Sequence, residues 1–230
     1  MIQRFVHTGE KNCLQKGSEF LLRKIVVNIT ASCVIVVAIS YLFDEIIYRS
    51  SMGLPPNLIN AISILFAFII SNLYLNYKYP ITIDLFGIEK KYLKKLLLYG
   101  ITGGVILILL NSPFRRGLDT IIIERYLVNP KEGHAFVTIF LIIVVVLVPI
   151  IEEIYYRAFI FRIVGVGASK FWSFSIASIL FSAGHGISLS AFLSSLILCF
   201  IFEKAEIVGP CIIAHILWNL VWFGSKYYMI

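Results

Sequence analysis

The sequence predicts an all-α membrane protein, a polytopic bundle of about seven transmembrane helices (six to eight). Two observations lead to this prediction. Hydrophobic residues make up 59% of the 230 residues and charged residues only 14%, whereas about a quarter of a typical globular chain is charged. A soluble fold of this size could not cover its surface with so few polar side chains. In addition, apolar runs of about 20 residues, the length that crosses a bilayer, recur along the chain.

The chain divides into a basic cytoplasmic tail (1–24), amino-terminal membrane spans (25–112), a connecting loop (113–134) and a carboxyl-terminal core (135–226). The expected spans, in chain order, are 25–48, 58–77, 96–110, 135–163, 171–185, 189–202 and 207–223. The third, fifth and sixth are short for unaided spans, so the count ranges from six to eight. Residues 121–126 are expected to form a short interfacial helix.

The chain carries a net charge of +7, which we attribute to its orientation in the membrane and not to nucleic-acid binding. Lys and Arg lie mostly between apolar runs, where they set orientation and contact anionic lipid headgroups. Fourteen of the 20 Lys and Arg fall in the amino-terminal tail and the even-numbered connections. We therefore expect a multi-pass protein of the cell membrane with a cytoplasmic amino terminus. The four cysteines are scattered, which favours neither a disulfide framework nor a thiolate metal site.

Ionisable side chains inside membrane spans are costly, so they are candidate functional groups. The first cluster is the segment EEIYYR, which runs from Glu152 to Arg157. Residues four apart share a helical face, so Glu153 is expected to pair with Arg157, while Glu152 points about 100° away. One carboxylate is then neutralised, and the other is left in low-dielectric surroundings that suit a general base. The simpler alternative is that the three charges mark the end of a span.

Two further clusters follow in the same part of the chain. In FSAGH, Phe181 and His185 lie four apart, so the ring can pack beside the imidazole. In HILWN, His215 and Asn219 also lie four apart and can donate hydrogen bonds to a developing oxyanion. Each cluster has a structural alternative, in which the polar groups bind each other or join two helices. A shared site accounts for all three clusters more simply than three separate coincidences.

The three clusters together resemble the motifs of the CPBP family. This family comprises CAAX proteases and bacteriocin-processing or immunity proteins, which are also called Abi proteins. Its motifs are EExxxR, FxxxH and HxxxN, and they stand here in that order as EEIYYR, FSAGH and HILWN. A Gly-Pro pair shortly before the last His, here Gly209-Pro210, is also typical. The resemblance covers residues 135–226.

The resemblance implies an all-helical intramembrane endopeptidase of the glutamate type, with no cofactor and no metal. By motif position, Glu152 would activate the attacking water with help from His185. His215 and Asn219 would stabilise the tetrahedral oxyanion. The residues expected to support the site are Glu153, Arg157 and Phe181. The expected partner is a peptide or a membrane-anchored protein substrate, together with anionic lipid.

Other functions fit the sequence less well. Zinc held by Glu152, His185 and His215 is chemically possible, because nitrogen and oxygen ligands suit it, but it leaves Asn219 without a role. No HExxH, rhomboid GxSG or GxGD motif occurs. The main alternative is a non-catalytic immunity or membrane regulatory protein that binds a partner on the same scaffold. A transporter is disfavoured because the polar residues occupy only the carboxyl-terminal half. The substrate itself stays open between prenylated CAAX proteins, bacteriocin precursors, pheromone peptides and membrane-bound regulators.

Overall fold

The computed structural model describes residues 11–49, 56–111 and 134–227, and the regular structure in these ranges is helical throughout. The principal helices are α1 (Lys11–Arg49), α2 (Pro56–Lys78), α3 (Leu93–Asn111), a continuous helical stretch from α5 to α7, α8 (Lys170–Gly184), α9 (Leu189–Ala205) and α10 (Gly209–Tyr227). The prediction of an all-α bundle of about seven helices is confirmed. The expected interfacial helix at 121–126 lies outside the described residues.

Four helical segments are long and apolar enough to cross a membrane: Arg23–Leu42, Leu58–Lys78, Ile83–Asn111 and Thr138–Gly167. The other apolar helices are shorter. The 15 residues of α8 span only about 22 Å at 1.5 Å per residue, against a hydrocarbon core of about 30 Å. α8, and α9 with 17 residues, are therefore too short to cross the hydrocarbon core unaided.

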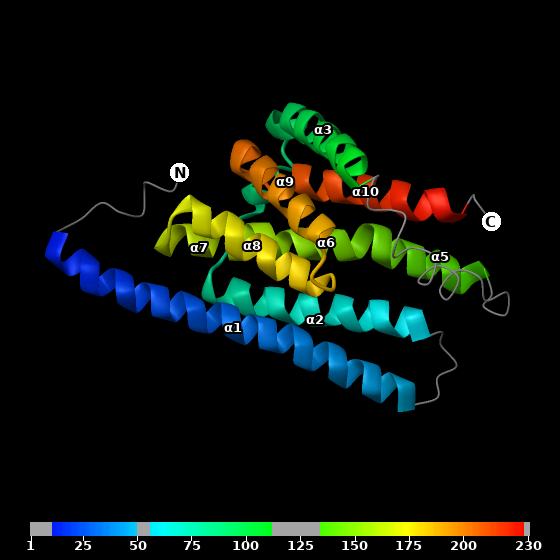
Figure 1. Cartoon of the computed structure of the whole chain (residues 1–230), viewed down its shortest axis with the longest axis horizontal. Coiled ribbons are helices and arrows are strands. Elements are labelled where there is room, and N and C mark those ends of the chain that lie inside the picture. Colours follow the sequence, from blue (N-terminus) through cyan, green and yellow to red (C-terminus); the bar gives the residue numbers. More distant parts are fainter. Residues whose placement is uncertain (1–10, 50–55, 112–133, 228–230) are drawn as a thin grey trace.

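The helices form two groups on either side of the α5–α7 stretch (Figure 1). On one side α1 packs along α2, where the Ser71 hydroxyl donates a hydrogen bond to the Ser32 carbonyl. On the other side α3 lies against α9 and α10. Glycines permit this close approach, because a Cβ at Gly103 would come within 2.3 Å of Ile201 Cδ1. Small residues let helices pack closely in a membrane, where no hydrophobic effect drives them together.

The central stretch from His134 to Gly167 is not a uniform α-helix. It passes through α5 (His134–Ile142), the π-helical η5 (Ile143–Leu147), α6 (Val148–Glu153), the π-helical η6 (Ile154–Phe161) and α7 (Arg162–Gly167). Pro149, which has no backbone N–H to donate, lies directly after the first π-helical segment, at the start of α6. Within that segment, the Val144 carbonyl accepts a hydrogen bond from the Asn219 side chain at 3.1 Å.

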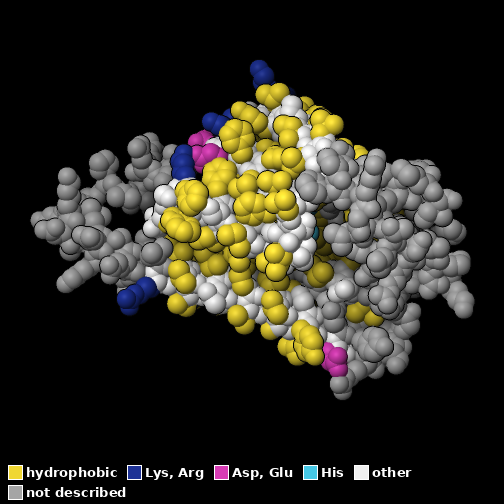
Figure 2. All heavy atoms as spheres, in the orientation of Figure 1, with side chains coloured by type: hydrophobic (Ala, Val, Ile, Leu, Met, Phe, Trp, Pro, Cys, Tyr) yellow, Lys and Arg dark blue, Asp and Glu magenta, His cyan; other side chains and the backbone are white. Residues whose placement is uncertain are grey.

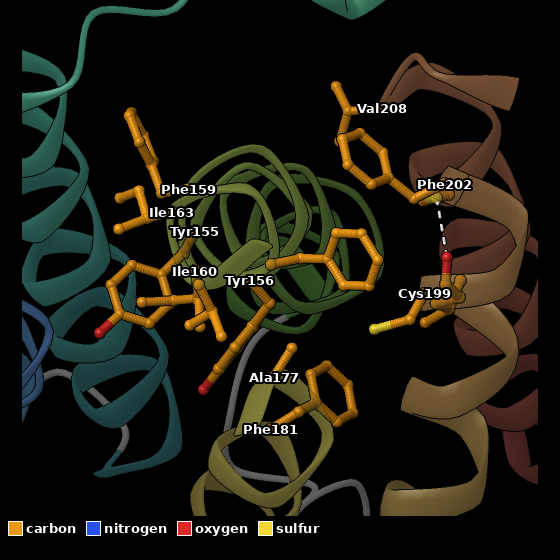
Figure 3. Packing of buried hydrophobic residues seen from close by; sticks show 14 of the residues in the cluster. Tyr155, Tyr156, Phe159, Ile160, Ile163, Ala177, Phe181, Cys199, Phe202 and Val208 are labelled. Carbon is orange, nitrogen blue, oxygen red and sulfur yellow. Dashed lines mark hydrogen bonds between the residues drawn. The ribbon is translucent and has the colours of Figure 1, made fainter. Parts of the chain in front are cut away.

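Aromatic rings surround η6 and form the centre of the core (Figure 3). Tyr155 contacts Phe68 of α2 edge-to-face at 5.2 Å, and Tyr156 contacts Phe181 of α8 at the same distance. Phe161 packs against Phe202 of α9 at 5.6 Å. Hydrophobic side chains also cover the outer face that Figure 2 displays, as expected of a surface in contact with lipid. The core therefore fixes η6, which directly follows the two glutamates, against three neighbouring helices.

Candidate active site

Glu153 is the centre of a buried polar cluster. Its Oε1 accepts a hydrogen bond from Arg157 Nη1 at 3.0 Å and another from His215 Nδ1 at 2.8 Å. At most 1% of each of these three residues is exposed. The expected pairing of Glu153 with Arg157 is therefore present. It accounts for two charges buried in the bundle, because a buried ion is tolerated only when it is paired and hydrogen-bonded.

Glu152 lies beside this cluster without joining it. It is also buried, and its Oε2 lies 4.0 Å from Nε2 of His215. This separation is too long for a direct hydrogen bond. One water oxygen at about 2.8 Å from each atom would bridge it. The two adjacent glutamates thus have different surroundings: Glu153 is neutralised by a guanidinium, and Glu152 faces an imidazole.

The His215 ring is held in a fixed orientation. Trp218 stacks on it, with ring centroids 5.5 Å apart and an interplanar angle of 27°, and Phe181 contacts it edge-on at 5.8 Å. A carboxylate only accepts hydrogen bonds, so Nδ1 carries the proton in its bond to Glu153. The other nitrogen, Nε2, is therefore the one directed at Glu152. It donates a hydrogen bond only when the ring is an imidazolium.

His185 lies at the edge of the site. It follows α8 directly, its ring stacks on Phe181 at 4.3 Å, and its Nδ1 lies 2.8 Å from the Phe181 carbonyl oxygen. This is the packing expected from their spacing. Unlike the other candidate residues of the three motifs, His185 is exposed. The Phe181 ring contacts both His185 and His215, so it connects the exposed imidazole to the buried one.

Asn219 lies one helical turn beyond His215 on α10, and its Nδ2 donates to the Val144 carbonyl of η5. A carboxamide nitrogen carries two hydrogens, so this bond engages one of them. The structure therefore places the Asn219 side chain against the central helix, at Val144. The interaction ties α10 to η5 at the point where the backbone hydrogen-bond pattern is interrupted.

Sequence reasoning missed three residues of the site. Ser195 of α9 accepts a hydrogen bond from Arg157 Nη2 through its Oγ, at 3.0 Å. Asn72 of α2 donates to the Ile151 carbonyl at 3.1 Å, directly before the glutamates. The sequence indicates only a packing or interfacial role for Trp218, yet it is the stacking partner of His215. An asparagine inside an expected span could have indicated a functional residue. A serine in an apolar helix gives no such indication.

The three side chains considered as zinc ligands are not gathered in one place. Within the described ranges, no group of three or more His, Cys, Asp or Glu is arranged to hold a metal ion. Glu152 and His215 face each other, but the His185 ring is directed to Phe181 and its own helix.

Ser195→Ala should destabilise the bundle by about 2 kcal/mol, because it removes the nearer acceptor of a buried, charged donor and leaves only the Ser195 carbonyl at 3.5 Å. The measurement is the unfolding midpoint in one detergent at matched concentration. Ser173→Ala is the control, since Ser173 is also a buried serine and its hydroxyl has no hydrogen-bond partner among the described residues. Equal midpoints for the two variants would show that the Ser195 hydrogen bond contributes nothing to stability.

Residues 134–221 match the family model described as type II CAAX prenyl endopeptidase Rce1-like. The matched segment runs from α5 into α10 and contains all three motifs. No curated protein and no solved structure matches the chain significantly.

Proposed function

We propose that this membrane protein is an intramembrane endopeptidase with Glu152 as its general base, because residues 134–221 match the Rce1-like family model of type II CAAX prenyl endopeptidases. One observation above all supports this function. Two neighbouring glutamates lie buried in the bundle, one paired with Arg157 and the other 4.0 Å from His215 Nε2. When two neighbouring carboxylates have different surroundings, one can act as an acid or a base while the other has a separate role.

In the proposed reaction, Glu152 takes a proton from a water molecule whose oxygen attacks the carbonyl carbon of the scissile peptide bond. The tetrahedral intermediate carries its negative charge on the former carbonyl oxygen. Hydrogen bonds from His215 Nε2, as imidazolium, and from Asn219 stabilise that oxyanion. The C–N bond then breaks, and the proton held by Glu152 passes to the departing amine. The products are a carboxylate and an amine.

Glu153 and Arg157 act as positioning residues in this proposal. Glu153 holds Nδ1 of His215 at 2.8 Å, which directs Nε2 toward Glu152. Arg157 compensates the charge of Glu153, and Ser195 holds the guanidinium in place. His185, at the exposed edge of the site, would exchange protons between Glu152 and water. Catalysis depends on this fixed geometry, because preorganised groups need no reorganisation during the reaction.

The proposed substrate is a short peptide or a membrane-tethered chain. A prenylated CAAX protein, a bacteriocin precursor, a pheromone peptide or a membrane-bound regulator each has this form. The proposed location is the cell membrane, with several spans and a cytoplasmic amino terminus. Its basic residues would contact anionic lipid headgroups there.

The test is cleavage of a peptide library by the purified full-length protein in detergent, with and without a chelator. We expect turnover in the wild type that the chelator leaves unchanged. Glu152→Ala and His215→Ala should lose this turnover while keeping the wild-type unfolding profile. A fully active Glu152→Ala protein would refute the proposal, and turnover abolished by the chelator would favour a metal site instead.

One observation favours a second function, that of an immunity or regulatory protein without turnover. Asn219 bonds the Val144 carbonyl and His185 bonds the Phe181 carbonyl, so both groups have structural partners. A scaffold that only binds a partner would need these structural hydrogen bonds and no catalytic role for either side chain. It predicts that Glu152→Ala retains protection or partner binding in cells, whereas the enzyme loses its biological effect with the same substitution.

A further inference from the structure

We propose that the connection between α2 and α3 is a membrane-surface element that binds anionic phospholipid headgroups and so holds the start of α10, the helix that carries His215. The connection comprises residues 79–92, and Lys94 and Lys95 follow it in the first turn of α3. This inference goes beyond the proposed function and needs only that the protein spans a membrane. Three observations support it: the depth of the connection, its exposed side chains and its contacts with the turn before α10.

The lengths of the flanking helices place the connection at the membrane surface. α2 has 23 residues and α3 has 19, so at 1.5 Å per residue they measure about 34 Å and about 28 Å. Each is close to the roughly 30 Å of the hydrocarbon core, and neither needs the residues between them to cross it. The connection joins α2, on one side of the bundle, to α3 on the other (Figure 1). It therefore lies where both helices leave the hydrocarbon core, in the headgroup layer.

Two apolar side chains of the connection are exposed. Ile83 begins the short helix η2 (Ile83–Phe86), and Ile88 follows the turn at Gly87; each is 74% exposed. Side chains of this size are costly to leave in water. In the headgroup layer they reach the boundary of the acyl chains, as the apolar residues of interfacial segments do. A lipid surface therefore accounts for their exposure.

The cations of this element exceed its anions. Residues 78–95 hold five lysines and two acidic residues. Glu89 pairs with Lys91 at 2.8 Å, whereas exposed Lys90 and Lys94 form no ion pair with a described residue. These two lysines are four residues apart, about one helical turn, so their like charges repel each other. An anionic headgroup relieves this repulsion, and juxtamembrane lysines attract such headgroups.

The connection is bonded to the turn that precedes α10. The Val208 N–H donates to the Leu85 carbonyl at 2.7 Å, and Lys95 Nζ donates to the Ala205 carbonyl at 3.2 Å. Val208 and Ala205 are both fully buried. α10 begins one residue after Val208. These bonds therefore join the surface element to the start of the helix that carries His215.

Two glycines let the connection and the turn approach each other closely. Gly87 has a φ of 68°, in the left-handed region, and a Cβ there would lie 2.5 Å from Ile207 Cδ1. A Cβ on Gly209 would lie 2.6 Å from the Phe86 carbonyl oxygen. A junction packed this closely transmits a displacement from one side to the other. Lipid that fixes the connection therefore also fixes the start of α10.

The experiment places the full-length protein in nanodiscs of two compositions, phosphatidylcholine alone and an equimolar mixture with phosphatidylglycerol. The first measurement is the unfolding midpoint. The test variant is Lys90→Gln/Lys94→Gln. The matched control is Arg23→Gln/Lys24→Gln, which removes two exposed cations of α1 that also form no ion pair with a described residue.

We expect phosphatidylglycerol to raise the midpoint of the wild type by about 4–8 °C, the effect of two surface lysines on a chain of this size. The test variant should lose most of this shift, and the control should keep most of it. No shift in the wild type, or an equal loss in both variants, would overturn the inference. The same shift produced by inorganic phosphate in phosphatidylcholine discs would also overturn it, because the site would then bind a soluble anion.

The second measurement is hydrogen exchange, which tests the link to α10. The Val208 N–H exchanges with deuterium only when its bond to the Leu85 carbonyl opens. Phosphatidylglycerol should slow exchange of the peptide containing Val208 several-fold in the wild type and leave it unchanged in the test variant. Unchanged exchange in the wild type would refute the hold on α10. Neither measurement needs turnover, so their failure is distinct from a failure of the peptide-cleavage test.

Discussion

Glu152→Gln is expected to lower kcat by about 10²- to 10⁴-fold, the contribution of a positioned general base, while the protein remains folded. Glutamine fills the same space but cannot accept the proton of the attacking water. The unfolding midpoint should be unchanged or higher, because a buried carboxylate that lacks a close partner is costly to desolvate. The measurements are peptide cleavage and thermal unfolding of the same purified sample.

Glu206→Gln is the matched control, since Glu206 is an exposed carboxylate in the turn after α9. It should leave both activity and midpoint at the wild-type values. A Glu152→Gln protein that loses activity together with several degrees of stability would point to a structural role for this carboxylate, and one that keeps its activity would remove it from the mechanism.

Arg157→Met should destabilise the bundle by about 3–5 kcal/mol, because it leaves the Glu153 carboxylate buried without its cation. The double variant Glu153→Gln/Arg157→Met should recover most of this loss. Its glutamine still accepts the hydrogen bond of His215 Nδ1, and no buried charge remains unpaired. Unfolding midpoints of the wild type, both single variants and the double variant form a double-mutant cycle that measures the coupling.

Arg162→Met, an exposed arginine further along the same helical stretch, serves as the control and should shift the midpoint little. A double variant as unstable as the sum of the two single variants would show that the ion pair has no coupling energy. The destabilisation would then come from lost packing of the Arg157 side chain against Phe181, whose ring centroid lies 4.8 Å from the guanidinium.

Local spacing was sufficient to predict the ion pair and the ring stack. Glu153 and Arg157, like Phe181 and His185, lie four residues apart on one helix, and helix geometry alone places such side chains together. The apolar runs predicted the helices themselves. Their ends were less certain, since α1 begins at Lys11, well inside the expected tail, and α10 extends to Tyr227. Helix ends depend on packing and capping more than on composition.

The sequence by itself determined that this chain forms a helical membrane bundle and that three motifs carry its polar groups, because hydrophobicity and helical period are local properties. Only the tertiary structure decided which helices bring those groups together. Contacts between residues far apart in sequence, such as His215 with Glu153 and Ser195 with Arg157, have no periodic signal. The same holds for Asn219, whose partner is the Val144 carbonyl in the π-helical segment of another helix.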